Sequence, residues 1–233
     1  MKLLALDSAT ELCSAALLID DRQLVREELV GRGHAERLLP MVEELLSEAG
    51  IAVGALDGFA VGRGPGAFTG VRIAISIVQG LSQGTGLPIV PVSDLAAIAA
   101  RVDSHDLPVL SLIDARMGQL YWGLFAPEAA PSGWHGVPEQ LSAPEAIEIS
   151  AQRFVVAGPG WGVYPELTRR LESRLEAAYA GLWPRALDIG RLARGALAAG
   201  QGVPAEALEP VYLRDSVATP TSRAPSGPRR RGA

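Results

Sequence analysis

A pattern that occurs twice, 107 residues apart, constrains the fold of this 233-residue chain more than any other feature. Residues 2–7 (KLLALD) and 12–19 (LCSAALLI) predict two strands joined by a short polar turn, and the first strand ends in Asp7. A shift of 107 residues aligns Asp7 with Asp114 and the second strand with residues 119–125. The sequence therefore predicts two related lobes, each beginning with a hairpin whose first strand ends in an aspartate.

The first lobe predicts the element order βββαβαβα. The expected elements are strands 2–7, 12–19 and 22–30, helix 34–48, strand 56–62, helix 71–83, strand 87–92 and helix 94–101. Gly50 is expected to end the first helix and Ser93 to cap the last. In the more degenerate second lobe we expect helices at 144–149, 165–176 and 185–199, with a strand at 153–157. Residues 1–103 and 104–217 are the predicted lobes, and residues 218–233 are a predicted disordered tail rich in Arg and Pro.

Composition favours an α/β protein and excludes several chemistries. Apolar residues make up 48% of the chain but aromatic residues only 5%, so Ala, Val, Leu and Ile must build the core. The 21 basic residues include a single Lys, Lys2, which excludes the interior lysine of P-loop proteins, protein kinases and pyridoxal enzymes. One Cys excludes an internal disulfide. Because the chain shows neither a signal-peptide pattern nor ~18 consecutive apolar residues, we expect a cytoplasmic protein without membrane contact.

The glycine-rich run at residues 62–72 lies between a predicted strand and a predicted helix, and two interpretations stay open. Backbone amides at the start of the helix can bind a phosphate. Alternatively, Gly64 and Gly66 supply unusual backbone dihedrals and Thr69 caps the helix. The run does not fit a dinucleotide fingerprint, because Thr69 stands where the third glycine would fall.

Single residues elsewhere carry weaker signals. Ser82 matches a G-x-S-x-G nucleophile motif, but it lies near a helix end, where we expect close packing instead. Cys13 is expected in the core. His34 has Leu38 where a second metal ligand on the same helical face would stand, so we expect no metal site. Asp7 and Asp114 either bind a ligand at the strand ends or cap turns.

Six blocks of sequence between residues 4 and 218 are specific enough to be compared with known families. They are LALDSATELCSAAL (4–17), GHAERLLP (33–40), GRGPGAFTGVRI (62–73), LIDARMGQLYW (112–122), AGPGW (157–161) and PVYLRDSVA (210–218). The blocks resemble the bacterial TsaB (YeaZ) family. The resemblance implies the two-lobed α/β fold of actin, Hsp70 and sugar kinases, which agrees with the internal repeat.

The resemblance also implies a role in tRNA modification. A TsaB-like chain is a non-catalytic subunit that binds and activates a TsaD-like transferase. That transferase moves threonylcarbamoyl from threonylcarbamoyl-AMP to the adenosine next to the anticodon, in tRNAs that read codons beginning with A. A TsaE-like ATPase joins the pair, and the isolated chain forms a homodimer. The tRNA is then contacted only indirectly, through the complex.

Two departures from active relatives argue for a scaffold. The catalytic paralogue carries a His-x-x-x-His metal pair, whereas this chain has His34 and Leu38. The nucleotide-binding hairpin of active relatives favours Asp-x-Gly, whereas Asp7 is followed by Ser8 and Ala9. We therefore expect no catalytic residue, no metal and no cofactor of the chain's own, with ADP or ATP only at the boundary with the catalytic partner.

The helices at 34–48 and 71–83 carry more apolar surface than one sheet face needs, and we expect them to form the partner interface. The expected interface residues are Leu38, Leu39, Met41, Val42, Leu45, Val71, Arg72, Ile75, Val78 and Gln79. The family-motif residues expected to contact a nucleotide or the interface are Asp7, Gly64, Gly66, Thr69, Gly70, Asp114 and Arg116.

Two other functions stay open. The first is that the chain is an independent ATP-dependent phosphotransferase or peptidase of the same fold. A direct tRNA binder would depend on Arg229, Arg230 and Arg231 in the tail. The formal net charge is −5 although the last sixteen residues hold four Arg and no acid, so the remaining body is acidic and a poor binder of nucleic acid by itself.

Overall fold

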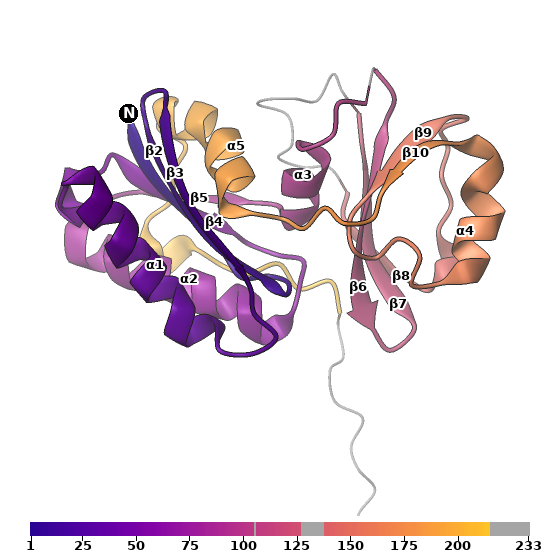
Figure 1. The fold of residues 1–233 in the computed structure, drawn as a ribbon, viewed down its shortest axis with the longest axis horizontal. Coiled ribbons are helices and arrows are strands. Elements are labelled where there is room, and N and C mark those ends of the chain that lie inside the picture. The colour runs from indigo at the N-terminus through magenta and orange to yellow at the C-terminus, as the bar shows by residue number, and fades with distance from the viewer. Residues whose placement is uncertain (105, 127–137, 215–233) are drawn as a thin grey trace, which may run out of the picture.

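The computed structural model describes residues 1–104, 106–126 and 138–214, which form two lobes, each built on a five-stranded mixed sheet (Figure 1). The strand order is β3-β2-β1-β4-β5 in the first sheet and β8-β7-β6-β9-β10 in the second. In the first sheet β1 pairs antiparallel with β2 and parallel with β4. In the second, β6 makes the same two pairings with β7 and β9. The predicted duplication and the two-lobed fold are therefore confirmed.

The elements of the first half follow the predicted order. They are β1 (Lys2–Asp7), β2 (Leu12–Ile19), β3 (Arg22–Leu29), α1 (His34–Ala49), β4 (Gly58–Gly62), α2 (Phe68–Thr85), β5 (Ile89–Val92) and α3 (Asp94–Ala99). Gly50 ends α1 in the left-handed conformation, with φ of 67°, and the Ser93 hydroxyl accepts a hydrogen bond from Ala96 N at the start of α3. Both predicted helix boundaries are confirmed.

The start of α2 differs from the prediction. The helix begins at Phe68 and is preceded by Ala67, so Thr69 lies inside its first turn and does not cap it. The N–H of Val71 donates to Ala67 O, which shows that regular helical bonding is already established there. The helix also continues through Gly84 and ends only at Gly86, because a Gly inside a helix weakens it without breaking it.

The second half repeats the order with one helix missing. Its elements are β6 (Val109–Arg116), β7 (Gln119–Phe125), β8 (Gln140–Ser142), β9 (Phe154–Ala157), α4 (Pro165–Leu171), β10 (Leu175–Tyr179) and α5 (Ala186–Ala198). The predicted helix at 144–149 is only a 3₁₀ turn, Pro144–Ala146, followed by extended chain. The predicted helix 165–176 is too long, because β10 begins at Leu175.

Arginine side chains from the α4 region bind the extended segment that stands in place of a helix. Arg170 donates to the carbonyl oxygens of Pro144 (2.6 Å) and Ile147 (2.8 Å), and Arg174 donates to that of Ile149 (3.0 Å). Ile147 and Ile149 are buried against the second sheet, as the apolar face of a helix would be. The segment thus covers the sheet without a helix because side chains satisfy its backbone carbonyls.

The last helix of each half packs on the sheet of the other half. Helix α3 lies between the lobes in Figure 1, and its Leu95 and Ile98 are buried with Val109 and Phe125 of the second sheet. Helix α5 covers the first sheet on the face opposite α1 and α2. One helix from each side of the predicted division at residue 104 therefore packs on the sheet of the other side, since sequence order does not decide which sheet a helix covers.

None of the helices in the described part of the chain has both the length and the apolar character that a membrane span requires. The predicted disordered tail at 218–233, with Arg229, Arg230 and Arg231, lies outside the described residues.

Candidate functional site

An apolar groove of about 390 Å³ runs along the outer face of the first lobe between α1 and α2. We call it the α1/α2 groove, and it is lined by Ala35, Leu39, Phe68, Thr69, Arg72, Ile73, Ser76 and Ile77. Leu39 is 42% exposed and Phe68 is 55% exposed, which is unusual for large apolar side chains on adjacent helices. The groove is therefore a candidate surface for a partner protein.

Most of the predicted interface residues lie on the opposite side of the same helices. The seven that are buried in the core of the first lobe are Leu38, Met41, Val42, Leu45, Val71, Ile75 and Val78. They pack against the sheet and cannot also contact a partner. Gln79 is also engaged, because its amide donates to the carbonyl oxygens of Ala205 (3.0 Å) and Leu208 (3.1 Å). Only Leu39 and Arg72 of the predicted set line the groove.

The groove-facing residues of α2 form a second stripe, of which Ile73, Ser76 and Ile77 were not predicted from the sequence. Thr69, Arg72, Ile73, Ser76 and Ile77 follow the i, i+3, i+4, i+7, i+8 spacing of one helical face. The same spacing is present in the sequence, but the neighbouring stripe is more apolar, which is the property of a stripe that faces the core.

Arg72 occupies an aromatic corner at one end of the groove. Its guanidinium carbon lies 3.3 Å from the centre of the Phe68 ring and 4.9 Å from the centre of the Tyr212 ring. The two rings are 6.1 Å apart. Tyr212 belongs to the C-terminal segment, so the corner joins α2 to a part of the chain that is distant in sequence.

The glycine-rich loop packs against the turn of the first hairpin. A Cβ atom on Gly66 would lie 2.4 Å from Ala9 O, and one on Gly70 would lie 2.0 Å from Ser8 O. Of the two glycines that were predicted to supply unusual backbone dihedrals, Gly64 has a positive φ of 96° but Gly66 does not. Gly66 is needed instead for close approach.

The amides of this loop bind protein acceptors. Gly64 N donates to Asp94 Oδ2 (2.5 Å), and Ala67 N donates to Ala9 O (2.7 Å). Since these donors already have partners, the geometry favours the structural interpretation of the loop over phosphate binding.

Asp7 and Asp94 form a fully buried pair of carboxyl groups beneath the loop. Burial raises the pKa of Asp7 to about 6, and burial together with the Asp7 charge raises the pKa of Asp94 well above its ordinary value. Asp7 Oδ1 accepts from Ala9 N (2.9 Å), so the carboxylate caps the turn. A nucleotide or its metal ion cannot reach a side chain that is sealed in this way, and Asp7 does not fit the role of a ligand.

A second hollow, of about 430 Å³, lies between the two hairpin turns. Asp114 Oδ1 accepts from Arg116 N (3.0 Å), which repeats the Asp7 turn in the second lobe. Arg116 also forms ion pairs with Asp114 (3.1 Å) and, across the lobes, with Glu11 (3.1 Å). Arg214 donates to the Gln119 side chain (2.8 Å) from the other side. The two family-motif residues of the second lobe are thus brought together in this hollow, which shares Phe68 with the α1/α2 groove.

Several residues singled out from the sequence have structural roles. The Ser82 hydroxyl lies within α2 and donates to Leu87 O (2.6 Å), so it is no nucleophile elbow. Cys13 is fully buried, and burial raises the pKa of its thiol to about 11, which confirms the core assignment. His34 Nε2 lies 2.9 Å from Thr10 O. Among the described residues, no three His, Cys, Asp or Glu side chains come together as metal ligands.

The chain is similar to proteins of known family over nearly its whole length. A family model described as TsaD, tRNA N6-adenosine threonylcarbamoyltransferase, matches residues 25–129. The tRNA threonylcarbamoyladenosine biosynthesis protein TsaB of Escherichia coli is 40% identical over 226 residues, which cover 94% of this chain and 96% of that protein. The TsaB of Haemophilus influenzae is 36% identical over 228 residues, covering 93% and 95%. The structure of YeaZ from Pseudomonas aeruginosa matches with a TM-score of 0.80 and 44% identity over 91% of this chain and 99% of that one.

Proposed function

The chain belongs to the TsaB family, and from this premise we propose that it is a non-catalytic subunit in threonylcarbamoyladenosine formation in tRNA, which binds and activates a TsaD-like transferase through the α1/α2 groove. Participation in this biosynthesis follows from the family. We further propose the docking surface, the activation of the transferase and the absence of a reaction catalysed by this chain itself.

The observation that carries the proposal is the exposed apolar face of α1 and α2. The first lobe completes its core with the other faces of these helices, and Ile77 is only partly buried against that core. Leu39 and Phe68 remain exposed although they are large and apolar. A helical face of this kind favours burial by further helices.

The match of the TsaD family model supports the identity of the partner. The matched residues 25–129 include both α1 and α2. A TsaD-like protein is therefore expected to present a related pair of helices, and two such pairs can pack as a four-helix bundle. The same face can pair with a second copy, which supports a homodimer when the chain is alone.

The absence of catalysis is supported by what surrounds the motif residues. Asp7 is sealed in the core, Leu38 packs inside the first lobe where a metal ligand of the paralogue would stand, and the loop amides serve protein acceptors. We therefore place any ADP or ATP, and a TsaE-like ATPase, at the boundary with the catalytic subunit. The tRNA is contacted through the complex.

The test is a pair of substitutions in the groove. Leu39→Asp and Ile77→Asp should abolish co-purification with the catalytic subunit of the same organism and reduce threonylcarbamoyladenosine formation in a reconstituted reaction, because each places a charge in an apolar contact. Val163→Asp, at a 44% exposed apolar residue of the second lobe, is the matched control and should change neither. Full binding by both groove variants would refute this docking surface.

A further inference from the structure

We propose that Arg72 is the polar anchor of the α1/α2 groove and that a helix of the catalytic partner places an Asp or Glu carboxylate against it. This inference rests on the proposed function, and it adds what kind of helix the groove selects. The partner helix must be apolar along the groove and carry one carboxylate at the aromatic corner.

The first step of the argument is that Arg72 is an uncompensated charge. Its Nη1 is shielded from solvent and has no hydrogen-bond partner among the described residues. The ion pairs found in the described part of the chain include Arg63 with Glu139 (3.2 Å) but none with Arg72. A guanidinium stays protonated in proteins, so this charge cannot be removed by loss of a proton.

The second step is that the guanidinium is held in a fixed place. Contact with the Phe68 ring at 3.3 Å and the Tyr212 ring at 4.9 Å orients it by cation–π attraction. Such rings favour the charge but accept no ordinary hydrogen bonds, so they fix the position of the donors without satisfying them. An oriented guanidinium is prepared for the two parallel hydrogen bonds that a carboxylate can accept.

The third step is the position of Arg72 on the groove. Arg72, Ile73 and Ile77 lie on one face of α2, so a helix that covers the isoleucines also passes the guanidinium. An apolar residue there would leave a buried charge without a partner, whereas a carboxylate would compensate it. Charge complementarity therefore selects among apolar helices, and it explains why a groove that is otherwise apolar keeps an arginine.

The experiment measures the dissociation constant of the full chain with the catalytic subunit of the same organism, by calorimetry at 50 and 300 mM NaCl. Arg72→Met should weaken binding at least ten-fold at low salt and remove most of the salt dependence. Arg72→Lys, which keeps the charge but loses the planar fork, should give an intermediate loss. Arg153→Met, at an exposed arginine of the second lobe that pairs with Glu176, should leave the constant unchanged.

A charge exchange then identifies the carboxylate. Arg72→Glu should abolish binding, and replacing one acidic residue on the partner's docking helices by Arg should restore it. Circular dichroism melts of each variant confirm folding, and Arg72→Lys keeps the test informative where a larger change disturbs the fold.

The possible results separate this inference from the proposed function. An unchanged constant for Arg72→Met, together with lost binding for Leu39→Asp, would overturn the anchor and leave the docking surface standing. Full binding by Leu39→Asp and Ile77→Asp would overturn both. If Arg72→Met abolished only self-association in sedimentation, the carboxylate would belong to a second copy, such as its exposed Glu36 or Glu43, and the proposal would be wrong.

Discussion

The carboxyl groups of Asp7 and Asp94 lie next to each other in the interior of the first lobe, and Asp7 Oδ2 and Asp94 Oδ1 have no hydrogen-bond partner among the described residues. Two adjacent buried carboxyl groups are not both ionised readily, so the pair retains a proton to higher pH than a free carboxyl group does. Gly62 makes the contact possible, because a Cβ there would lie 2.4 Å from Asp94 Oδ1 and 2.7 Å from Asp7 Oδ1. The pair joins the end of β1 to the start of α3, the helix that packs on the second sheet.

This pair should make stability fall as pH rises. The pKa of Asp7 is raised to about 6 in the folded chain from an ordinary 3.8, so the folded state holds the proton more strongly. The resulting stabilisation is complete below the ordinary pKa and is lost as pH rises through 6, which for Asp7 alone amounts to roughly 3 kcal/mol. The raised pKa of Asp94 extends the loss to higher pH.

Asp94→Asn should reduce this dependence, since an amide can donate to Asp7 and accept from Gly64 N without ionising. The free energy of unfolding, measured by urea titration from pH 4 to pH 9, should fall less with pH in the variant than in the natural chain. Asp21→Asn, in an exposed turn, is the control and should follow the natural chain. Parallel curves for Asp94→Asn and the natural chain would show that the pair does not retain a proton to higher pH.

The fold was predictable from the sequence wherever an element and its neighbour are close in the chain. The two hairpins are predictable because alternation and a short polar turn are local properties. The first strand of the second hairpin, however, continues past Asp114 to Arg116. The exchange of α3 and α5 between the sheets was not found. An apolar helix face shows that a sheet is covered but not which one, and two related sheets offer equivalent surfaces.

The site was predictable as a region but not residue by residue. Helix α2 has two stripes that carry apolar residues, and the sequence does not state which one faces the sheet. The more apolar stripe, with Ile75 and Val78, is the one in the core. Arg72 was predicted as an interface residue and lines the groove, but its contact with Tyr212 joins residues 140 positions apart and has no local signal in the sequence.

Two glycines of α2 should respond to alanine in opposite directions. A Cβ at Gly70 would lie 2.0 Å from the backbone oxygen of Ser8, so Gly70→Ala must displace the hairpin turn and should cost several kcal/mol, about 3 or more. A Cβ at Gly80 meets nothing within 4 Å, so Gly80→Ala should stabilise the helix by about 1 kcal/mol. Urea titrations of both variants measure these changes. Equal effects at the two positions would contradict the close packing of the loop on the turn.

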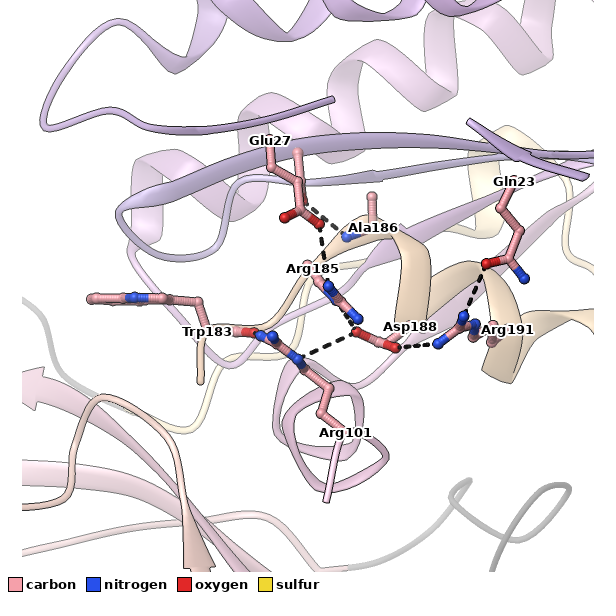
Figure 2. A network of polar contacts seen from close by, with 9 residues as sticks. Gln23, Glu27, Arg101, Trp183, Arg185, Ala186, Asp188 and Arg191 are labelled. Carbon is pink, nitrogen blue, oxygen red and sulfur yellow. Dashed lines mark hydrogen bonds and ion pairs between the residues drawn. The ribbon is translucent and has the colours of Figure 1, made fainter. Parts of the chain in front are cut away.

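Asp188 lies at the centre of three arginines, one of which also pairs with Glu27 (3.8 Å), and it should contribute strongly to holding the exchanged helices together (Figure 2). Its side chain, in the first turn of α5, is 3% exposed and pairs with Arg185, with Arg191 at 3.3 Å and with Arg101 at 3.6 Å. Arg101 lies just beyond α3 and also donates to Trp183 O (2.6 Å). The carboxylate therefore connects the two helices that cross between the lobes.

Asp188→Asn keeps the shape of the side chain but removes the negative charge that three guanidinium groups share. Loss of one member of a buried ion pair leaves the other uncompensated, so unfolding free energy should fall by about 3 kcal/mol. Glu176→Gln is the matched control, because it removes the acid of the Arg153–Glu176 pair, whose side chains are 67% and 44% exposed, and should cost less than about 1 kcal/mol. The double variant Arg101→Met with Asp188→Asn should be less destabilised than the sum of the two single changes, since the first removes part of the excess charge. Strict additivity in urea titration would mean that Asp188 does not act across the lobes, and that α3 and α5 are held together by their apolar contacts alone.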